Sequence, residues 1–116
     1  IVIQGKTFSV EVAKTEAELK KGLSGHKPLL DNEGMIFLFD REDTYGFWMR
    51  DMLFPIDIIW LTKDWKITHI ENSIAPETYP KVYSSTFPSK YVLEVSAGTA
   101  ERLGWEIGDA VLFYKK

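Results

Sequence analysis

Residues 47–60, FWMRDMLFPIDIIW, combine a strongly apolar composition with three charged side chains. The stretch holds four aromatic residues, two Met, three Ile and one Pro, and its charges are Arg50, Asp51 and Asp57. The proline interrupts the chain, and the run that follows is rich in β-branched and aromatic residues. Because that run is apolar on nearly both faces, we expect a strand at 56–62 that lies centrally in a sheet or is packed on both sides.

Working outward from this strand, the chain alternates short apolar runs with turn-forming residues. These patterns indicate strands at 1–3, 7–12, 34–39, 46–49, 56–62, 66–73, 91–96 and 110–114. A polar turn is expected at 40–44, and 75–88, which contains three prolines, is expected to form a long ordered loop.

Two segments have the pattern of short helices. TEAELKKGLSG, 15–25, begins with a capping box formed by Thr15 and Glu18, and Gly25 can end the helix in a left-handed conformation. AGTAERLG, 97–104, is the second predicted helix, and it also ends at a glycine.

The predicted elements favour a mostly β fold, a small antiparallel β-barrel or sandwich with two short helices. The strands come in runs joined by short turns, without a regular βαβ alternation, so a parallel doubly wound sheet is not expected. A chain of 116 residues is long enough for one hydrophobic core, and we expect a single domain over 1–116.

The composition excludes several classes of function. The formal net charge of −3 comes without a basic stripe, so a nucleic-acid partner is not expected. No run of about 20 apolar residues is present, so this fragment has no predicted membrane span. The absence of cysteine excludes disulfides, Cys–zinc sites and thiol catalysis. Aromatic residues reach 14%, and those outside the core are candidates for ligand contact.

A succession of motifs resembles the bacterial and archaeal DUF192 family. These motifs are the helix ending GLSG, then GMIFLF, FWMRDMLFPIDIIW, ENSIAP, YVLEVSAG and LGWEIGD. The resemblance runs from about residue 7 to 115 and implies a compact, mostly β fold. It implies no activity, because none is assigned to the family. Relatives often have a cysteine after the Ala75-Pro76 dipeptide, where this chain has Glu77, Thr78 and Tyr79.

The same resemblance implies a location outside the cytoplasm. Many family members carry an N-terminal signal or anchor segment, and this chain starts at Ile1 rather than Met. We therefore expect a secreted, periplasmic or membrane-anchored protein.

Two acids interrupt apolar strands. Asp57 lies between two Ile residues, and Glu94 interrupts VLEV. A buried carboxylate needs a partner, so we expect a structural polar cluster of Arg50, Asp57 and Glu94, with loop N–H groups as a further source of partners. The alternative is a hydrolase in which Asp57 and Glu94 form a catalytic carboxylate pair.

The aromatic residues point to a binding surface. In a strand at 46–49, Phe47 and Trp48 point to opposite faces, so one of them can line a surface groove. We expect a non-catalytic binding module, a monomer, with a groove between 47–55 and 76–88. Trp48 and Tyr79 would stack on the ligand, and Arg50 and Asp51 would supply polar contacts.

The ligand of such a groove would be a saccharide, an envelope polymer or an extended peptide. A protein–protein interaction domain is the other alternative. No cofactor or metal is expected: His69 and Glu71 share a strand face, but no third ligand is evident.

Overall fold

The computed structural model describes residues 2–3 and 5–113 of the chain. Its strands are β1 (Val2–Ile3), β2 (Lys6–Thr7), β3 (Ser9–Ala13), β4 (Glu33–Asp43), β5 (Gly46–Trp48), β6 (Ile56–Leu61), β7 (Ile67–Ile74), β8 (Val82–Ser84), β9 (Ser89–Ser96) and β10 (Val111–Leu112). Its helices are α1 (Glu16–Lys21), the 3₁₀ helix η1 (Pro76–Thr78) and α2 (Thr99–Leu103). A mostly β fold with two short α-helices is therefore confirmed.

The strands form one central sheet and two small ones. The central sheet has the order β3-β4-β9-β6-β7, the second has the order β10-β1-β2, and β5 pairs with β8 in a two-stranded ribbon. All six residues of β6 are buried, and β6 pairs with β9 on one side and β7 on the other. The expected central strand, packed on both faces, is therefore confirmed.

The sheet differs from the predicted architecture in one strand pair and in its closure. β3 and β4 are parallel, with Ser9 opposite Glu33 and Ala13 opposite Phe37. A parallel pair needs a crossover connection, and residues 14–32, which include α1, provide it. The central sheet is also open, with β3 and β7 at its two ends, so it does not form a closed barrel.

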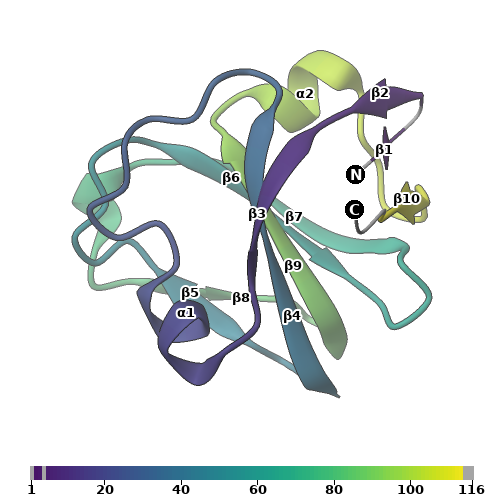
Figure 1. The fold of residues 1–116 in the computed structure, drawn as a ribbon, viewed down its shortest axis with the longest axis horizontal. Coiled ribbons are helices and arrows are strands. Elements are labelled where there is room, and N and C mark those ends of the chain that lie inside the picture. The colour runs from purple at the N-terminus through teal and green to yellow at the C-terminus, as the bar shows by residue number, and fades with distance from the viewer. Residues whose placement is uncertain (1, 4, 114–116) are drawn as a thin grey trace.

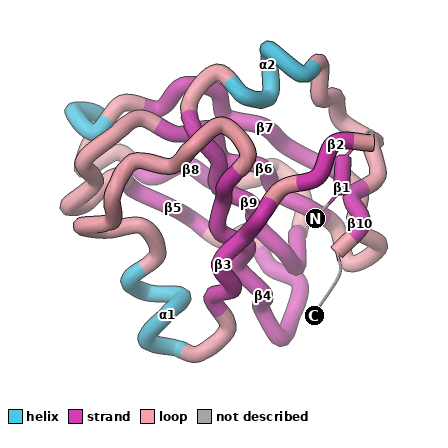
Figure 2. Tube along the Cα trace, turned by 45° about the horizontal axis from the view of Figure 1, so that its top comes forward, coloured by secondary structure: helices cyan, strands magenta, loops and turns pink. Residues whose placement is uncertain are grey.

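Elements cover both faces of the central sheet (Figures 1 and 2). On one side, which we call the α1 face, α1 and the β5–β8 ribbon cover a core of Ala13, Leu23, Met35, Phe37, Met49, Phe54, Ile56, Ile58, Trp60, Ile74, Tyr83 and Val92. On the other side, the α2 face, α2 and the small sheet cover Phe8, Ile36, Ile59, Leu61, Ile67, Leu93, Val95, Ala100, Trp105 and Val111. Strand alternation sends neighbouring residues of β4, β6 and β9 into different cores.

Several element boundaries in the structure differ from those predicted. The Thr15–Glu18 capping box forms as expected, but α1 ends at Lys21 and its C-cap is Gly22, with φ of 52°. The predicted polar turn at 40–44 is wrong for most of its length, because β4 continues to Asp43 with exposed side chains.

The expected loop at 75–88 contains η1 and β8, so it is more regular than predicted. Residues 1 and 114, at the ends of the first and last predicted strands, lie outside the described residues. None of the helices in the described part of the chain is long and apolar enough to span a membrane.

Candidate functional site

Asp57 is fully buried on the α2 face, where backbone N–H groups satisfy its carboxylate. Its Oδ1 accepts hydrogen bonds from the N–H groups of Ser73 at 2.7 Å and Gly98 at 3.1 Å. Its Oδ2 accepts one from the N–H of Ala100 at 2.9 Å. Gly98 and Ala100 belong to the N-terminal end of α2, where free N–H groups favour an acceptor with negative charge. The carboxylate therefore joins β6, β7 and α2.

The register of β6 and β9 separates Asp57 from Glu94. Asp57 is paired with Val95, while Glu94 is paired with Ile58. Paired residues share a face and consecutive residues alternate, so the two carboxyl groups point to opposite sides of the sheet. The catalytic pair considered from the sequence is therefore not formed.

Arg50 does not complete the predicted polar cluster either. Its side chain is 62% exposed, whereas Asp57 and Glu94 are buried. Its Nε lies 3.9 Å from Oδ2 of Asp51, in a solvent-exposed pair. The cluster of Arg50, Asp57 and Glu94 is therefore corrected: Asp57 is satisfied by backbone donors, which the sequence also allowed, and Arg50 belongs to the surface.

The four residues expected to bind a ligand do come together, on the outer side of the β5–β8 ribbon. The rings of Trp48 and Tyr79 have centroids 5.0 Å apart at an interplanar angle of 52°, and they are 45% and 44% exposed. The guanidinium carbon of Arg50 lies 5.8 Å from the centroid of the Trp48 ring. We call Trp48, Arg50, Asp51 and Tyr79 the platform.

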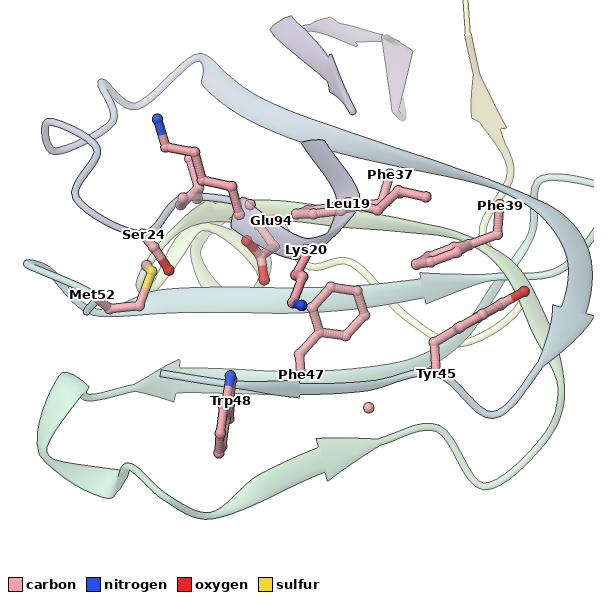
Figure 3. A pocket seen from close by; sticks show the side chains of 14 residues that line it. Leu19, Lys20, Ser24, Phe37, Phe39, Tyr45, Phe47, Trp48, Met52 and Glu94 are labelled. Atoms are coloured by element: carbon pink, nitrogen blue, oxygen red, sulfur yellow. The ribbon is translucent and has the colours of Figure 1, made fainter. Parts of the chain in front are cut away.

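The ribbon explains why Trp48 faces outward. In β5, Phe47 is opposite Tyr83 and Trp48 is opposite Val82. Phe47 packs inward, with its ring 5.1 Å from Phe37 and 6.0 Å from Trp60 in edge-to-face contacts. Since neighbours in a strand point to opposite faces, Trp48 is directed away from the core (Figure 3).

The turn that carries Arg50 and Asp51 is fixed to the segment after α1. The Ser24 hydroxyl donates to the Arg50 carbonyl at 2.8 Å, and the Gly25 N–H donates to the Asp51 carbonyl at 2.9 Å. Asp51 itself has φ of 56°. These hydrogen bonds fix Arg50 and Asp51 to the segment that follows α1, in addition to their covalent connection to β5.

On the inner side of β5, α1 and the sheet enclose a cavity of about 180 Å³. Its lining consists of Leu19, Lys20, Lys21, Gly22, Leu23, Ser24, Phe37, Phe39, Tyr45, Gly46, Phe47, Trp48, Met52 and Glu94. Figure 3 shows Glu94 between Met52 on one side and Lys20 and Phe47 on the other. We call this space the Glu94 cavity.

Glu94 is 5% exposed and has apolar neighbours on its strand face, Met35 of β4 and Ile58 of β6. Burial raises the pKa of Glu94 from 4.5 to about 8. The physical cause is desolvation, which penalises the charged carboxylate. Glu94 is thus a neutral carboxylic acid at pH 7.

Sequence reasoning named Glu94 but missed the cavity around it. Phe37 and Phe39 share the face of β4 that looks toward α1, because alternate residues of a strand point to the same face. What the pattern lacked was the register, which sets Met35 opposite Glu94.

His69 and Glu71 form a contact of 2.8 Å between Nε2 and Oε2. Within 2–3 and 5–113, no group of three or more His, Asp or Glu side chains is placed to hold a metal ion.

Comparisons with known proteins place the chain in a family. The DUF192 family model, described as "Uncharacterized ACR", matches residues 1–113. The chain belongs to the DUF192 family. No curated protein matches it.

Two solved structures have the fold of this DUF192 chain. A protein of unknown function from Novosphingobium aromaticivorans DSM 12444 is 39% identical, with a TM-score of 0.87 over 91% of this chain and 75% of that one. A protein from Sinorhizobium meliloti 1021, provisionally assigned as a transcription regulator, is 30% identical, with a TM-score of 0.85 over 89% of this chain and 79% of that one.

Proposed function

We propose that this DUF192 protein is a non-catalytic binding module whose platform recognises a saccharide, an envelope polymer or an extended peptide. The observation that carries the proposal is the pair of half-exposed rings of Trp48 and Tyr79 beside the Arg50 guanidinium. Trp and Tyr are suited to surfaces that are partly apolar and partly wet, and their stiff side chains lose little entropy on binding.

The platform has the features of a pre-organised contact surface. The Trp48 ring projects from a ribbon whose inner face packs on the core, and the Tyr79 ring projects from the end of η1. The turn with Arg50 and Asp51 is hydrogen-bonded to the segment after α1. Pre-organisation reduces the ordering cost of binding. Arg50 and Asp51 offer a donor and an acceptor next to the rings, which suits a ligand with both an apolar face and hydroxyl or amide groups.

The test is a ¹⁵N-labelled NMR titration with a panel of soluble oligosaccharides and of extended peptides. We expect a binder to shift the amide signals of β5, β8 and residues 49–52. Trp48→Ala should weaken its binding by about tenfold or more, as truncation of a central aromatic contact does.

The control is Ile107→Ala, which removes an exposed apolar side chain outside the platform and outside 47–55 and 76–88, and it should leave affinity unchanged. Affinity that survives in both Trp48→Ala and Tyr79→Ala, with folded spectra, would rule out the platform as the site.

A protein–protein interaction domain is the second candidate, and the edge of the sheet favours it. β3 ends the central sheet and has mostly exposed side chains. An edge strand offers unpaired backbone groups to an added strand. Peptides that shift the amides of β3, and not those of β5 and β8, would favour this role over the platform.

We also propose that the protein is a monomer and that it is located outside the cytoplasm. Light scattering in solution measures the mass of the particle, and a dimer would contradict the first part. The full-length gene product, examined for a signal or anchor segment before Ile1, tests the second.

A further inference from the structure

The Glu94 carboxyl group lines the cavity without a hydrogen-bond or ion-pair partner among the described residues. Glu94 is 5% exposed, and no described residue forms a hydrogen bond or ion pair with its carboxyl group. The carboxyl group borders the cavity, among Phe37, Phe47 and Met52 (Figure 3). A buried polar group without a partner is rare in folded proteins, and each case asks for an explanation.

The other hydrogen-bonding side chains of the lining either already have a partner in the protein or are exposed to solvent. The Ser24 hydroxyl donates to the Arg50 carbonyl, and the Tyr45 hydroxyl donates to the Arg41 carbonyl at 2.5 Å. Lys20 and Lys21 are exposed on α1, and neither forms an ion pair with Glu94. An occupant of the cavity would therefore meet apolar and aromatic walls, the Glu94 carboxyl group, and the side chains of Lys20 and Lys21 at the α1 side.

We propose that the Glu94 cavity is a binding site for a small organic amine, whose ammonium group pairs with the Glu94 carboxylate and whose apolar body contacts the aromatic walls. A carboxylate in an apolar site is stabilised by a cation or by a proton. Lys20 and Lys21 line the cavity, but among the described residues no cation forms an ion pair with Glu94. Aromatic side chains, here Phe37, Phe39, Tyr45 and Phe47, also attract an ammonium group.

Binding has a defined proton balance. The protonated carboxyl group of Glu94 and an alkylammonium ion combine into an ion pair, and one proton leaves to the solvent. Lys20, Lys21 and Tyr45 are the other titratable groups that line the cavity. Because the proton must leave, affinity rises with pH until the Glu94 carboxyl group of the free protein is itself ionised, and it falls again when the free amine loses its charge.

A matched set of ligands separates this proposal from its alternatives. Benzylamine supplies the ammonium group, benzyl alcohol is its neutral counterpart, and benzoate is an anion of similar size. The protein has three Met residues, so methyl-¹³C labelling gives three signals. Met52 lines the cavity, while Met49 is buried in the core and does not. Met49 is thus an internal reference.

We expect benzylamine to shift the Met52 methyl signal more than that of Met49, and to bind more tightly at pH 8 than at pH 6. Glu94→Gln should weaken binding by at least about tenfold, since a hydrogen bond to a charged group is lost. Glu101→Gln, which neutralises an exposed acid on α2, is the control and should not change it.

If Glu94→Gln does not fold, Leu19→Trp tests the same site by filling the cavity from α1, and it should abolish binding while keeping the carboxyl group. Equal or tighter binding of benzyl alcohol or benzoate would overturn the proposal. A Glu94 pKa below 7 that rises in Lys20→Met would also overturn the proposal, because Lys20 would then be the cation that pairs with Glu94. Since Tyr79 belongs to the platform and does not line the cavity, Tyr79→Ala tests the platform separately, and failure here leaves the platform untouched.

Discussion

Asp57 and Glu94 are buried acids on neighbouring paired strands, and the structure accommodates them in opposite ways. Asp57 accepts three backbone hydrogen bonds as a carboxylate on the α2 face. Glu94, on the α1 face, is accommodated by keeping its proton. One step in register, Asp57 beside Val95 and Glu94 beside Ile58, accounts for the different environments.

The raised pKa of Glu94 predicts how stability changes with pH. The unfolded chain releases this proton near pH 4.5, whereas the folded protein holds it to about pH 8. Between these values the unfolded state binds fewer protons, so this residue lowers the free energy of unfolding as pH rises, by about 1.4 kcal/mol per pH unit. The full stability is present below pH 4.5, and the loss is complete above pH 8.

Glu94→Gln should remove this contribution. Urea denaturation at several pH values should show the variant gaining on the wild type from pH 5 to pH 8, with a constant difference above that. Glu101→Gln should keep the wild-type slope. Parallel curves for wild type and Glu94→Gln would mean that Glu94 titrates normally.

At the scale of elements, Gly22 decides where α1 ends. Its φ of 52° favours glycine, and an added Cβ would lie 3.2 Å from Cζ of Phe37. Gly25 provides a matched comparison, with φ of 70° and nothing within 4 Å of an added Cβ. Both Ala variants would have to adopt a positive φ, which costs at least about 1–2 kcal/mol. Gly22→Ala should lose about 1–3 kcal/mol more, because it also overpacks the core.

Urea denaturation measures the two losses, and a double-mutant cycle identifies their cause. In a Phe37→Leu background the extra loss of Gly22→Ala should shrink, since the ring that it meets is gone. Equal losses for Gly22→Ala and Gly25→Ala in the wild type would show that the contact with Phe37 does not matter.

Local signals in the sequence were sufficient for some elements and not for others. The capping box of Thr15 and Glu18 and the apolar run of β6 depend on neighbours in the chain, and both form as predicted. The parallel pairing of β3 with β4 depends on contacts distant in sequence, and no periodicity reveals it. The same holds for the Glu94 cavity, which needs β4, β5, β9 and α1 to come together.

For the whole molecule, Asp57 is the point at which two strands of the central sheet, β6 and β7, are joined to α2. Its carboxylate oxygens accept a hydrogen bond from Ser73 of β7, where φ is 49° and the pairing with β6 shifts register. They also accept from Gly98 and Ala100 at the start of α2. Losing the carboxylate would leave three donors without an acceptor. Each unsatisfied buried donor costs about 1–3 kcal/mol, and two of the three hydrogen bonds are only partly buried. Asp57→Ala should therefore lower the free energy of unfolding by an amount in the lower part of the summed range, about 3–5 kcal/mol.

This loss should appear as one cooperative transition at lower urea concentration, since β6 lies inside the sheet and contacts both cores. Asp64→Ala, at an exposed acid in the β6–β7 turn, is the control and should change stability by less than about 0.5 kcal/mol. Asp57→Asn keeps one acceptor oxygen, and its loss of stability should lie between those of Asp64→Ala and Asp57→Ala. If Asp57→Ala unfolds at the wild-type midpoint, the carboxylate does not join β6 and β7 to α2.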